Sequence, residues 1–427
     1  MQLQASPHWY AEVSWRHWNA LLATWLGWAL DGFDFILITY VLSDVAKEFH
    51  VSLTTAGTLV LATFSTRWLG GALIGSVADR FGRKNAMIAG ILIYSVATGL
   101  CGISWSFWSL LIFRLFVGIG MAGEYAAGST LLLESWPSNM RNKASGFLVS
   151  GWAVGGLLAA AAYAPVFGAF GWRGLFFVGV LPALLTVYIR FGLPEPEEWR
   201  QAIQDVAPKV SFFQLFSRRW LAVSAAMVGL MFANFATTWP ILALMPTYLK
   251  SVHYAPAQVS LLMFLASFGA LLGYWASGFI GDWLGTRRAL IFGSGVSLIF
   301  IAMLFVAANV KVGAGLLGTS LFLIEFTSLG ITGLLPKYIA EQFDPTIRAA
   351  GLGTTYNIGS IAGGLSPVWG AALAGVIGLG PAIGALTGVW TLVFIAFLGF
   401  DVPRRARDRG LAIERRSLQT LDTNGPN

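Results

Sequence analysis

Long apolar stretches that carry almost no charge dominate this sequence and restrict the folds open to it. A helix needs about 20 mostly apolar residues to cross a bilayer, and twelve stretches of the 427-residue chain meet that requirement. Their approximate limits are 18–44, 54–78, 85–104, 106–131, 143–168, 172–192, 219–249, 257–281, 288–308, 312–336, 348–376 and 380–400. The sequence therefore predicts an all-α membrane protein with twelve transmembrane helices.

Composition argues against most other classes of protein. Charged residues make up 11% of the chain and apolar residues 56%, whereas an average soluble domain is about 25% charged. Cys101 is the single cysteine, so the sequence predicts neither an intramolecular disulfide nor a thiolate metal cluster. Phosphate-binding GxxxxGK[ST] and hydrolase GxSxG motifs do not occur in the sequence. We therefore expect neither an enzyme nor a receptor, and no metal or cofactor.

The distribution of lysine and arginine predicts the orientation of the chain. With the N-terminus inside, 21 of these residues fall in cytoplasmic segments and 4 on the opposite side. Basic residues favour the cytoplasmic side, so both termini are expected there, in a multi-pass protein of a bacterial inner membrane. This bias accounts for the net charge of +7 without nucleic acid. The basic tail is expected to contact lipid headgroups.

Two motifs occur twice, at nearly the same separation. The first pair is Gly75, Asp79 and Arg83 after the second stretch, and Gly278, Asp282 and Arg287 after the eighth. The second pair is Glu134 with Arg141 after the fourth stretch, and Glu341 with Arg348 after the tenth. Such repetition indicates duplication. We predict six-helix bundles at 1–192 and 219–400, joined by a cytoplasmic linker at 193–218 and followed by a basic cytoplasmic tail at 401–427.

The chemistry of these motifs is typical of a gate between bundles. Glycine allows close approach of two helices. The aspartate can accept hydrogen bonds from a neighbouring helix N-terminus, and the arginines can pair with Glu134 or Glu341 across the bundle. We expect such contacts to hold one conformation and to break in another, so the ten repeated residues are candidate gating residues.

The quoted motifs GSVADRFGRK, RLFVGIG and the paired E-x6-R resemble those of the Major Facilitator Superfamily. This resemblance implies a secondary transporter that works by alternating access. The segments LDGFDFILI, GMAGEY, ESWPSNMRNKASGF and LLPKYIAEQFDPTIRAAGLGTTYNIG resemble the bacterial sialate:proton symporters and their monocarboxylate-carrying relatives. That resemblance implies uptake of N-acetylneuraminate with a proton by a functional monomer. Proton symport of lactate or pyruvate is the alternative, and a proton-driven exporter is a third possibility.

Six ionisable residues lie within the apolar stretches: Asp31, Asp34, Arg67, Arg114, Glu124 and Glu325. A charge at the bilayer centre costs about 2.5–3.5 kcal/mol on insertion scales, so helices that only pack would avoid them. Counting about 1.5 Å of rise per residue brings Asp34 and Arg114 to similar depths. The same count places Asp31 and Arg67 near the middle of the membrane. Two acid–base pairs within the first bundle are therefore feasible.

These charges suggest how proton binding could be coupled to substrate binding. Burial favours the neutral form of a carboxyl group, whereas a nearby arginine favours the carboxylate. Protonation of Asp31, Asp34 or Glu124 would release Arg67 or Arg114 to bind a substrate carboxylate through two parallel hydrogen bonds. The family resemblance implies the same roles for Asp34, Arg114 and Glu124. A fixed ion pair between helices is the alternative for these groups.

Candidate substrate-binding residues of the second bundle are mostly neutral: Asn234, Trp239, Tyr356 and Asn357, with Glu325 as the exception. Amides and hydroxyls suit a polyol with an N-acetyl group, and aromatic faces suit a sugar ring. Glu325 could bind a substrate amide or hydroxyl. Hydrogen bonding between helices is the alternative role for these polar side chains.

Overall fold

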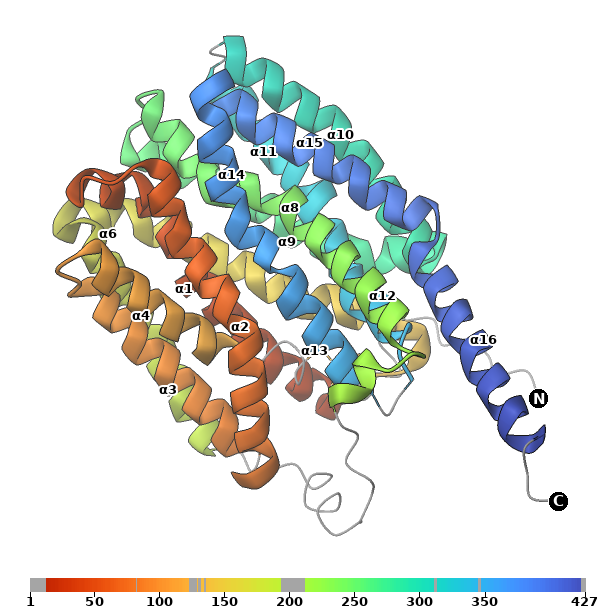
Figure 1. The fold of residues 1–427 in the computed structure, drawn as a ribbon. Helices are drawn as coiled ribbons and strands as arrows, with labels where there is room; N and C mark the ends of the chain where they lie inside the picture. Colours follow the sequence, from red (N-terminus) through yellow and green to blue (C-terminus); the bar gives the residue numbers. More distant parts are fainter. Residues whose placement is uncertain are drawn as a thin grey trace.

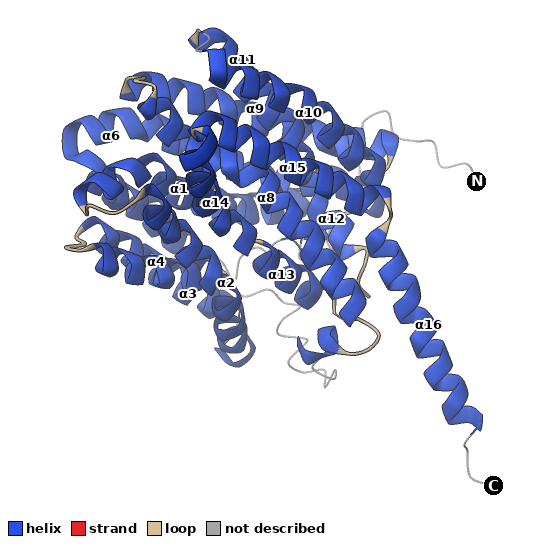
Figure 2. Ribbon diagram, turned by 45° about the horizontal axis from the view of Figure 1, so that its top comes forward, coloured by secondary structure: helices blue, strands red, loops and turns tan. Residues whose placement is uncertain are grey.

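The computed structural model describes residues 13–81, 83–122, 129, 132–133, 136–192, 212–310, 313–344 and 347–423, and over these ranges the chain forms helices and short connections without any strand (Figure 2). The main helices are α1 (Trp15–Glu48), α2 (Leu53–Phe81), α3 (Arg83–Gly102), α4 (Phe107–Met121), α6 (Arg141–Gly192), α8 (Leu221–Ser251), α9 (Pro256–Leu284), α10 (Thr286–Val310), α11 (Ala314–Ile324), α12 (Leu335–Ala340), α13 (Arg348–Gly359), α14 (Ile361–Ile377), α15 (Leu379–Gly399) and α16 (Val402–Thr423). Shorter 3₁₀ segments are η1 (Ser138–Met140), η2 (Phe212–Phe216) and η4 (Gly330–Leu334), and η3 (Glu325–Leu329) is a π-helix. The predicted all-α class is confirmed.

The helices follow the predicted apolar stretches, with three differences. The fifth and sixth stretches form one element, α6, that is broken at Gly171, where φ is 64°. The tenth stretch is divided into α11, η3, η4 and α12, and the eleventh into α13 and α14. Among the described residues, eight helices are long and apolar enough to cross a membrane, and two shorter apolar helices accompany them. These findings agree with the predicted membrane architecture.

Helices of the two halves of the chain gather on opposite sides of the molecule. In Figure 1 most of the first half, α1 to α6 in red to yellow, lies to the left, and the second half, α8 to α15 in green to blue, lies to the right. Contacts between α6 and α9 and between α2 and α14 join the two halves. Residues 193–211 of the predicted linker lie outside the described residues, so the domain limits stay predictions.

Most of the predicted basic tail forms a helix that docks on the second half. Arg219, just before α8, pairs with Asp344 and with Glu414 of α16, at 2.5 Å in each case. Arg407 of α16 donates a hydrogen bond to the carbonyl of Glu341 at 2.8 Å. The first turns of the tail therefore bind protein, which the prediction of a headgroup-binding tail did not include.

Glycines bring α2 and α4 into backbone contact in the middle of the first half. A Cβ added at Gly70 would lie 2.1 Å from the carbonyl oxygen of Ile119, and one at Gly118 would lie 2.1 Å from that of Thr63. Thr63 and Thr66 donate hydrogen bonds across this crossing to the carbonyl groups of α4. Small residues and hydroxyl groups are the usual means of close helix packing in membranes. The crossing fixes the heights of α2 and α4 relative to each other.

We expect Gly118→Leu to prevent stable folding, because a backbone carbonyl cannot move aside for the added side chain. Overpacking costs about 1–3 kcal/mol even where neighbours can adjust. Thermal unfolding of detergent-purified protein measures the effect. Gly295→Leu is the matched control, since a Cβ at Gly295 on α10 would have nothing within 4 Å. Equal unfolding midpoints for the two variants would contradict this account of the crossing.

Candidate functional site

Two buried arginines lie on the helices of this crossing. Arg67 on α2 is 1% exposed and Arg114 on α4 is 0% exposed. Among the described residues, two nitrogens of the Arg67 guanidinium (Nε and Nη1) and all three of Arg114 lack a hydrogen-bond partner. An arginine side chain keeps its charge in proteins. The two groups are therefore buried cations with donors available for an anion.

Arg114 lies in a polar cluster within the first half of the chain. Its charge acts on Asp34 of α1, which is 1% exposed, and on Cys101 of α3. Gly179 of α6 leaves room beside the carboxylate, since a Cβ there would lie 3.3 Å from Asp34 Oδ1. Among the described residues, neither oxygen of Asp34 has a hydrogen-bond partner. The predicted pair, Asp34 with Arg114, is therefore not a hydrogen-bonded salt bridge in this conformation.

Arg67 lies instead where the two halves of the chain meet. Its guanidinium carbon is 5.6 Å from the ring centre of Tyr356 on α13, in the second half. Asp31, the predicted partner of Arg67, is 3% exposed on α1. Asn357 lies beside α2, because a Cβ at Gly71 would be 3.6 Å from its Nδ2. Arg67, Tyr356 and Asn357, three predicted site residues, therefore lie together between the halves.

Aromatic rings from both halves pack around Arg67. Phe35 and Phe64 of the first half each have their ring centre 6.0 Å from the Arg67 guanidinium carbon. Trp239 of α8, a predicted site residue, has its ring centre 5.1 Å from that of Phe35 and 4.7 Å from that of Phe64. Phe235 of α8 lies 5.7 Å from Phe64 and 5.2 Å from Tyr356. Trp152 of α6 joins them, with its ring centre 6.0 Å from that of Phe35 and 6.2 Å from that of Trp239. We call these six the interface rings: Phe35, Phe64, Trp152, Phe235, Trp239 and Tyr356.

Sequence reasoning missed four of the six interface rings: Phe35, Phe64, Trp152 and Phe235. In an apolar stretch, a phenylalanine that lines a site and one that only packs look the same, and the chain contains 31 phenylalanines. The one available signal was position: Phe35 follows Asp34 directly, and Phe64 lies three residues before Arg67. Residues three or four apart share a helix face, so Phe64 and Arg67 could have been placed together.

Glu325 begins the π-helix that interrupts the tenth apolar stretch. It is 2% exposed, and among the described residues its Oε2 lacks a hydrogen-bond partner. Its charge acts on Tyr274 of α9, on which Tyr356 also acts. Glycine contacts hold this segment against α9, since a Cβ at Gly330 would lie 2.4 Å from the Cα of Gly273. Single-turn π segments are frequent at functional sites.

Two other candidates have different outcomes. Asn234 is 8% exposed on α8, and its carbonyl accepts a hydrogen bond of 3.2 Å from Thr238; α8 also supplies Trp239 to the interface rings. Glu124, the third candidate for proton coupling, lies outside the described residues. The structure therefore brings together most of the predicted site, in an Arg67 group between the halves and an Asp34–Arg114 group inside the first half.

At the predicted outer end, polar contacts hold the halves together. Lys250 at the end of α8 pairs with Asp44 of α1 and donates to the carbonyl of Tyr40, at 2.5 Å in each case. Nearby, the hydroxyl of Ser260 on α9 donates to the carbonyl of Ala160 on α6. These contacts join the first half to the second at this end.

At the predicted cytoplasmic end, the second copy of the repeated motif contacts the first half. Asp282 accepts a hydrogen bond from Asn142 at 2.9 Å and pairs with Lys143, both in the first turn of α6. A Cβ at Gly278 would lie 2.7 Å from the Cα of Lys143, so the expected close approach at this glycine is present. Asp282 was expected to bind the N-terminus of a neighbouring helix. It does contact the N-terminal turn of α6, in the other half, through the side chains of Asn142 and Lys143. The two halves are therefore in contact at both ends of the molecule.

The arginine partners predicted for this gate need correction. Arg287 does not bind Glu341: it pairs with Asp401 at 3.4 Å and donates to the carbonyls of Leu398 and Gly399 at the end of α15. The last carbonyls of a helix lack partners within the helix and favour a cation, which explains this choice. Glu341 pairs instead with Lys337, four residues earlier on the same turn of chain, at 2.9 Å.

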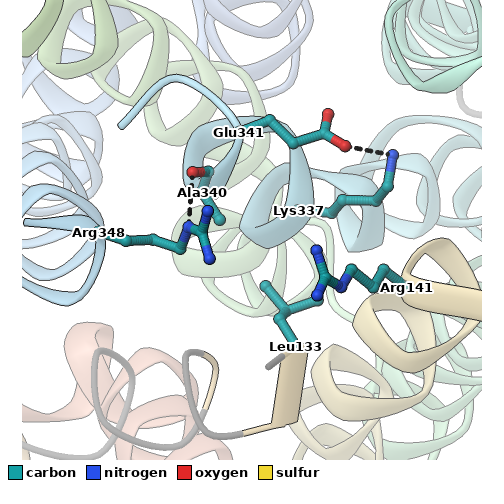
Figure 3. Close-up of a pocket in the computed structure, with 6 residues that line it drawn as sticks. All are labelled: Leu133, Arg141, Lys337, Ala340, Glu341 and Arg348. Atoms are coloured by element: carbon teal, nitrogen blue, oxygen red, sulfur yellow. Dashed lines mark hydrogen bonds and ion pairs between the residues drawn. The ribbon is translucent and has the colours of Figure 1, made fainter. Parts of the chain in front are cut away.

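A small cavity of about 20 Å³ lies between Glu341 and Arg348, from one copy of the E-x6-R motif, and Arg141, from the other copy. Figure 3 shows Arg141, Lys337 and Arg348 around it, with Glu341 turned toward Lys337. Arg348 donates to the carbonyl of Ala340 at 3.1 Å. Glu134 lies outside the described residues, and so do the side chains of Asp79 and Arg83. The backbones of Gly75, Asp79 and Arg83 belong to α2 and α3.

We expect Asp282→Asn to favour opening at the predicted cytoplasmic end, because it removes the charge that pairs with Lys143. A single reporter cysteine at Ser277, which is 0% exposed, can be introduced together with Cys101→Ser. Its rate of maleimide labelling should rise several-fold in Asp282→Asn. Asp401→Asn is the control, since the ion-pair partner of Asp401, Arg287, belongs to the same half. An unchanged rate in Asp282→Asn would show that this pair does not restrain the gate.

Comparison with known proteins agrees with this architecture. The family model of the Major Facilitator Superfamily matches residues 24–367. The sialic acid transporter NanX of Escherichia coli is 39% identical over 92% of this chain and 96% of its own length. The cis,cis-muconate transport protein of Acinetobacter baylyi is 31% identical over 84% of this chain and 89% of its own. The solved proton:xylose symporter XylE has the same fold, with a TM-score of 0.70 at 17% identity over 91% of this chain and 96% of its own.

These relatives are transporters and not enzymes, and the membrane helices described above have the length and composition that transport across a bilayer requires. The quoted sequence motifs, the family match and the fold lead to one assignment. This chain belongs to the Major Facilitator Superfamily and is a secondary transporter of small molecules.

Proposed function

We propose that the protein takes up N-acetylneuraminate together with a proton, by alternating access. The observation that carries the proposal is Arg67, a buried cation at the meeting of the two halves, with donors that lack partners among the described residues. A guanidinium binds a carboxylate through two parallel hydrogen bonds, and a ligand held there touches both halves. Similarity to the sialic acid transporter NanX supports the choice of substrate.

The surroundings of Arg67 suit the remainder of such a sugar. Tyr356 and Asn357 supply a hydroxyl and an amide from the second half, and Asn357 Oδ1 lacks a partner among the described residues. Trp239 supplies an aromatic face. Arg114 is better suited to proton coupling than to substrate binding, because Asp34, Cys101 and Phe35 around it all belong to the first half.

Proton coupling follows from the Asp34–Arg114 group in this proposal. A carboxyl group that is buried beside a guanidinium, without a hydrogen bond to it, is balanced between its neutral and charged forms. A substrate anion and a proton together carry no net charge, so their entry is not opposed by an inside-negative membrane potential. The carrier would work as a monomer in a bacterial inner membrane, among lipids, with the proton as its coupling ion and no cofactor.

A planar carboxylate is the second candidate substrate. The interface rings would stack against a conjugated carboxylate, and similarity to a cis,cis-muconate transport protein favours it. Lactate-sized substrates would contact fewer of the rings.

Uptake into proteoliposomes tests these alternatives. Labelled N-acetylneuraminate should accumulate when the outside is acidified, and unlabelled substrate should compete whereas lactate and muconate should not. If only lactate or only muconate competes, that carboxylate and not N-acetylneuraminate is the substrate. Accumulation that rises when the inside is acidified would indicate an exporter.

A further inference from the structure

Phe35 of α1 lies close to both buried arginines. It follows Asp34 on α1 and is 0% exposed. Its ring centre is 5.7 Å from the guanidinium carbon of Arg114 and 6.0 Å from that of Arg67. Both distances lie within about 6 Å, the range of an attractive contact between a cation and an aromatic face. One ring therefore touches both buried arginines.

The same ring also connects the first half to the second. Its centre lies 4.6 Å from that of Phe64, 6.0 Å from Trp152 and 5.1 Å from Trp239 of α8. Asp34, by contrast, lies beside Gly179 and Arg114 within the first half. Neighbouring residues on a helix point about 100° apart, so a rotation of α1 that moves Asp34 also moves Phe35 against Trp239.

We infer that Phe35 is the positioning residue that transmits the protonation state of Asp34 to the substrate site at Arg67. This inference rests on the proposed function. When Asp34 takes up a proton, Arg114 loses its anionic neighbour and the face of Phe35 remains as its attractive contact. Movement of that ring changes its contacts with Arg67 and with Trp239, and so joins proton binding to substrate binding.

The other ionisable groups around Asp34 do not offer this connection. Arg114 reaches it from α4 and Cys101 from α3, and both lie within the first half. Asp31 on α1 and Arg67 on α2 act on Tyr356 at the interface. The ring of Phe35 lies within about 6 Å of both guanidinium groups.

The test compares Phe35→Leu with Phe64→Leu in proteoliposomes that contain the full-length protein. Phe64 also contacts Arg67, at 6.0 Å, and its ring centre lies 4.6 Å from that of Phe35. For each variant, uptake of N-acetylneuraminate driven by a pH gradient is divided by counterflow at equal pH. We expect this ratio to fall about fivefold or more in Phe35→Leu and to stay near the wild-type value in Phe64→Leu, which should raise KM instead.

A second pair of variants separates the ring's electrostatic role from its volume. Phe35→Tyr keeps the aromatic face and should restore the ratio. Pentafluorophenylalanine at position 35 keeps the shape but reverses the charge distribution of the ring, and should lower the ratio even where Phe35→Leu does not fold. A wild-type ratio in both Phe35→Leu and the fluorinated protein would overturn the inference, and so would an equal loss in Phe64→Leu. If the wild-type protein itself shows no uptake driven by the pH gradient, the proposed function fails first.

Discussion

Arg67→Ala is expected to abolish uptake while the protein still folds and inserts. Removal of one partner from a buried, hydrogen-bonded charge pair costs about 2–5 kcal/mol, so we expect kcat/KM to fall by about a hundredfold or more. Arg67→Lys keeps the charge but loses the planar pair of donors, and should retain a small part of the activity. Initial rates of labelled N-acetylneuraminate uptake measure both effects.

The control is an arginine outside the site. Arg173 pairs with Glu48 at 2.6 Å and donates to the carbonyl of Ser104 at 3.0 Å, all within the first half. Arg173→Ala should transport at nearly the wild-type rate once expression is corrected. Wild-type uptake by Arg67→Ala would show that the substrate anion is bound elsewhere, with Arg114 as the next group to replace.

Asp34→Asn is expected to remove uphill accumulation and to retain counterflow exchange. A pH gradient of one unit is worth about 1.4 kcal/mol, which can concentrate a substrate about tenfold for each proton carried with it. Asparagine cannot take up a proton, so the final inside-to-outside ratio of substrate should fall to about one. Steady-state accumulation under an imposed gradient measures this ratio, and exchange of labelled for unlabelled substrate at equal pH measures the remaining transport.

Asp344→Asn is the matched control. Asp344 pairs with Arg219 at 2.5 Å at the predicted cytoplasmic end, and it belongs neither to the Arg67 group nor to the Asp34–Arg114 group. It should accumulate substrate as the wild-type protein does. If Asp34→Asn reaches the wild-type accumulation ratio, another carboxyl group carries the proton, and Asp31 and Glu124 become the candidates.

The apolar stretches were sufficient to predict the helical class and most helix limits, since in a bilayer the backbone must satisfy its hydrogen bonds internally. They did not predict that the tenth span contains a π-helix at Glu325. The segment that follows the π-helix packs against α9 through Gly330 and Gly273, which lie far apart in the chain.

The gate illustrates a similar limit. Repetition of the motif identified Asp282 and Arg287 as candidate gating residues, but not their partners. Asp282 binds the first turn of α6, about 140 residues earlier, and Arg287 binds the end of α15. By charge alone, Glu341 was a suitable partner for Arg287. In the structure Arg287 instead binds the last carbonyl groups of α15, which lack partners within the helix.

Sequence alone was enough to identify the family resemblance, the spans and the buried charges, because an ionisable group within an apolar span is costly wherever that span packs. It could not distinguish the role of Arg67 from that of Arg114, nor mark Phe35 among 31 phenylalanines. Those distinctions arise from the crossing of α2 with α4 and from the approach of α8 and α13. Helix packing determines which helix faces meet. The residues that meet are distant in the sequence, and no local sequence pattern indicates that they will be in contact.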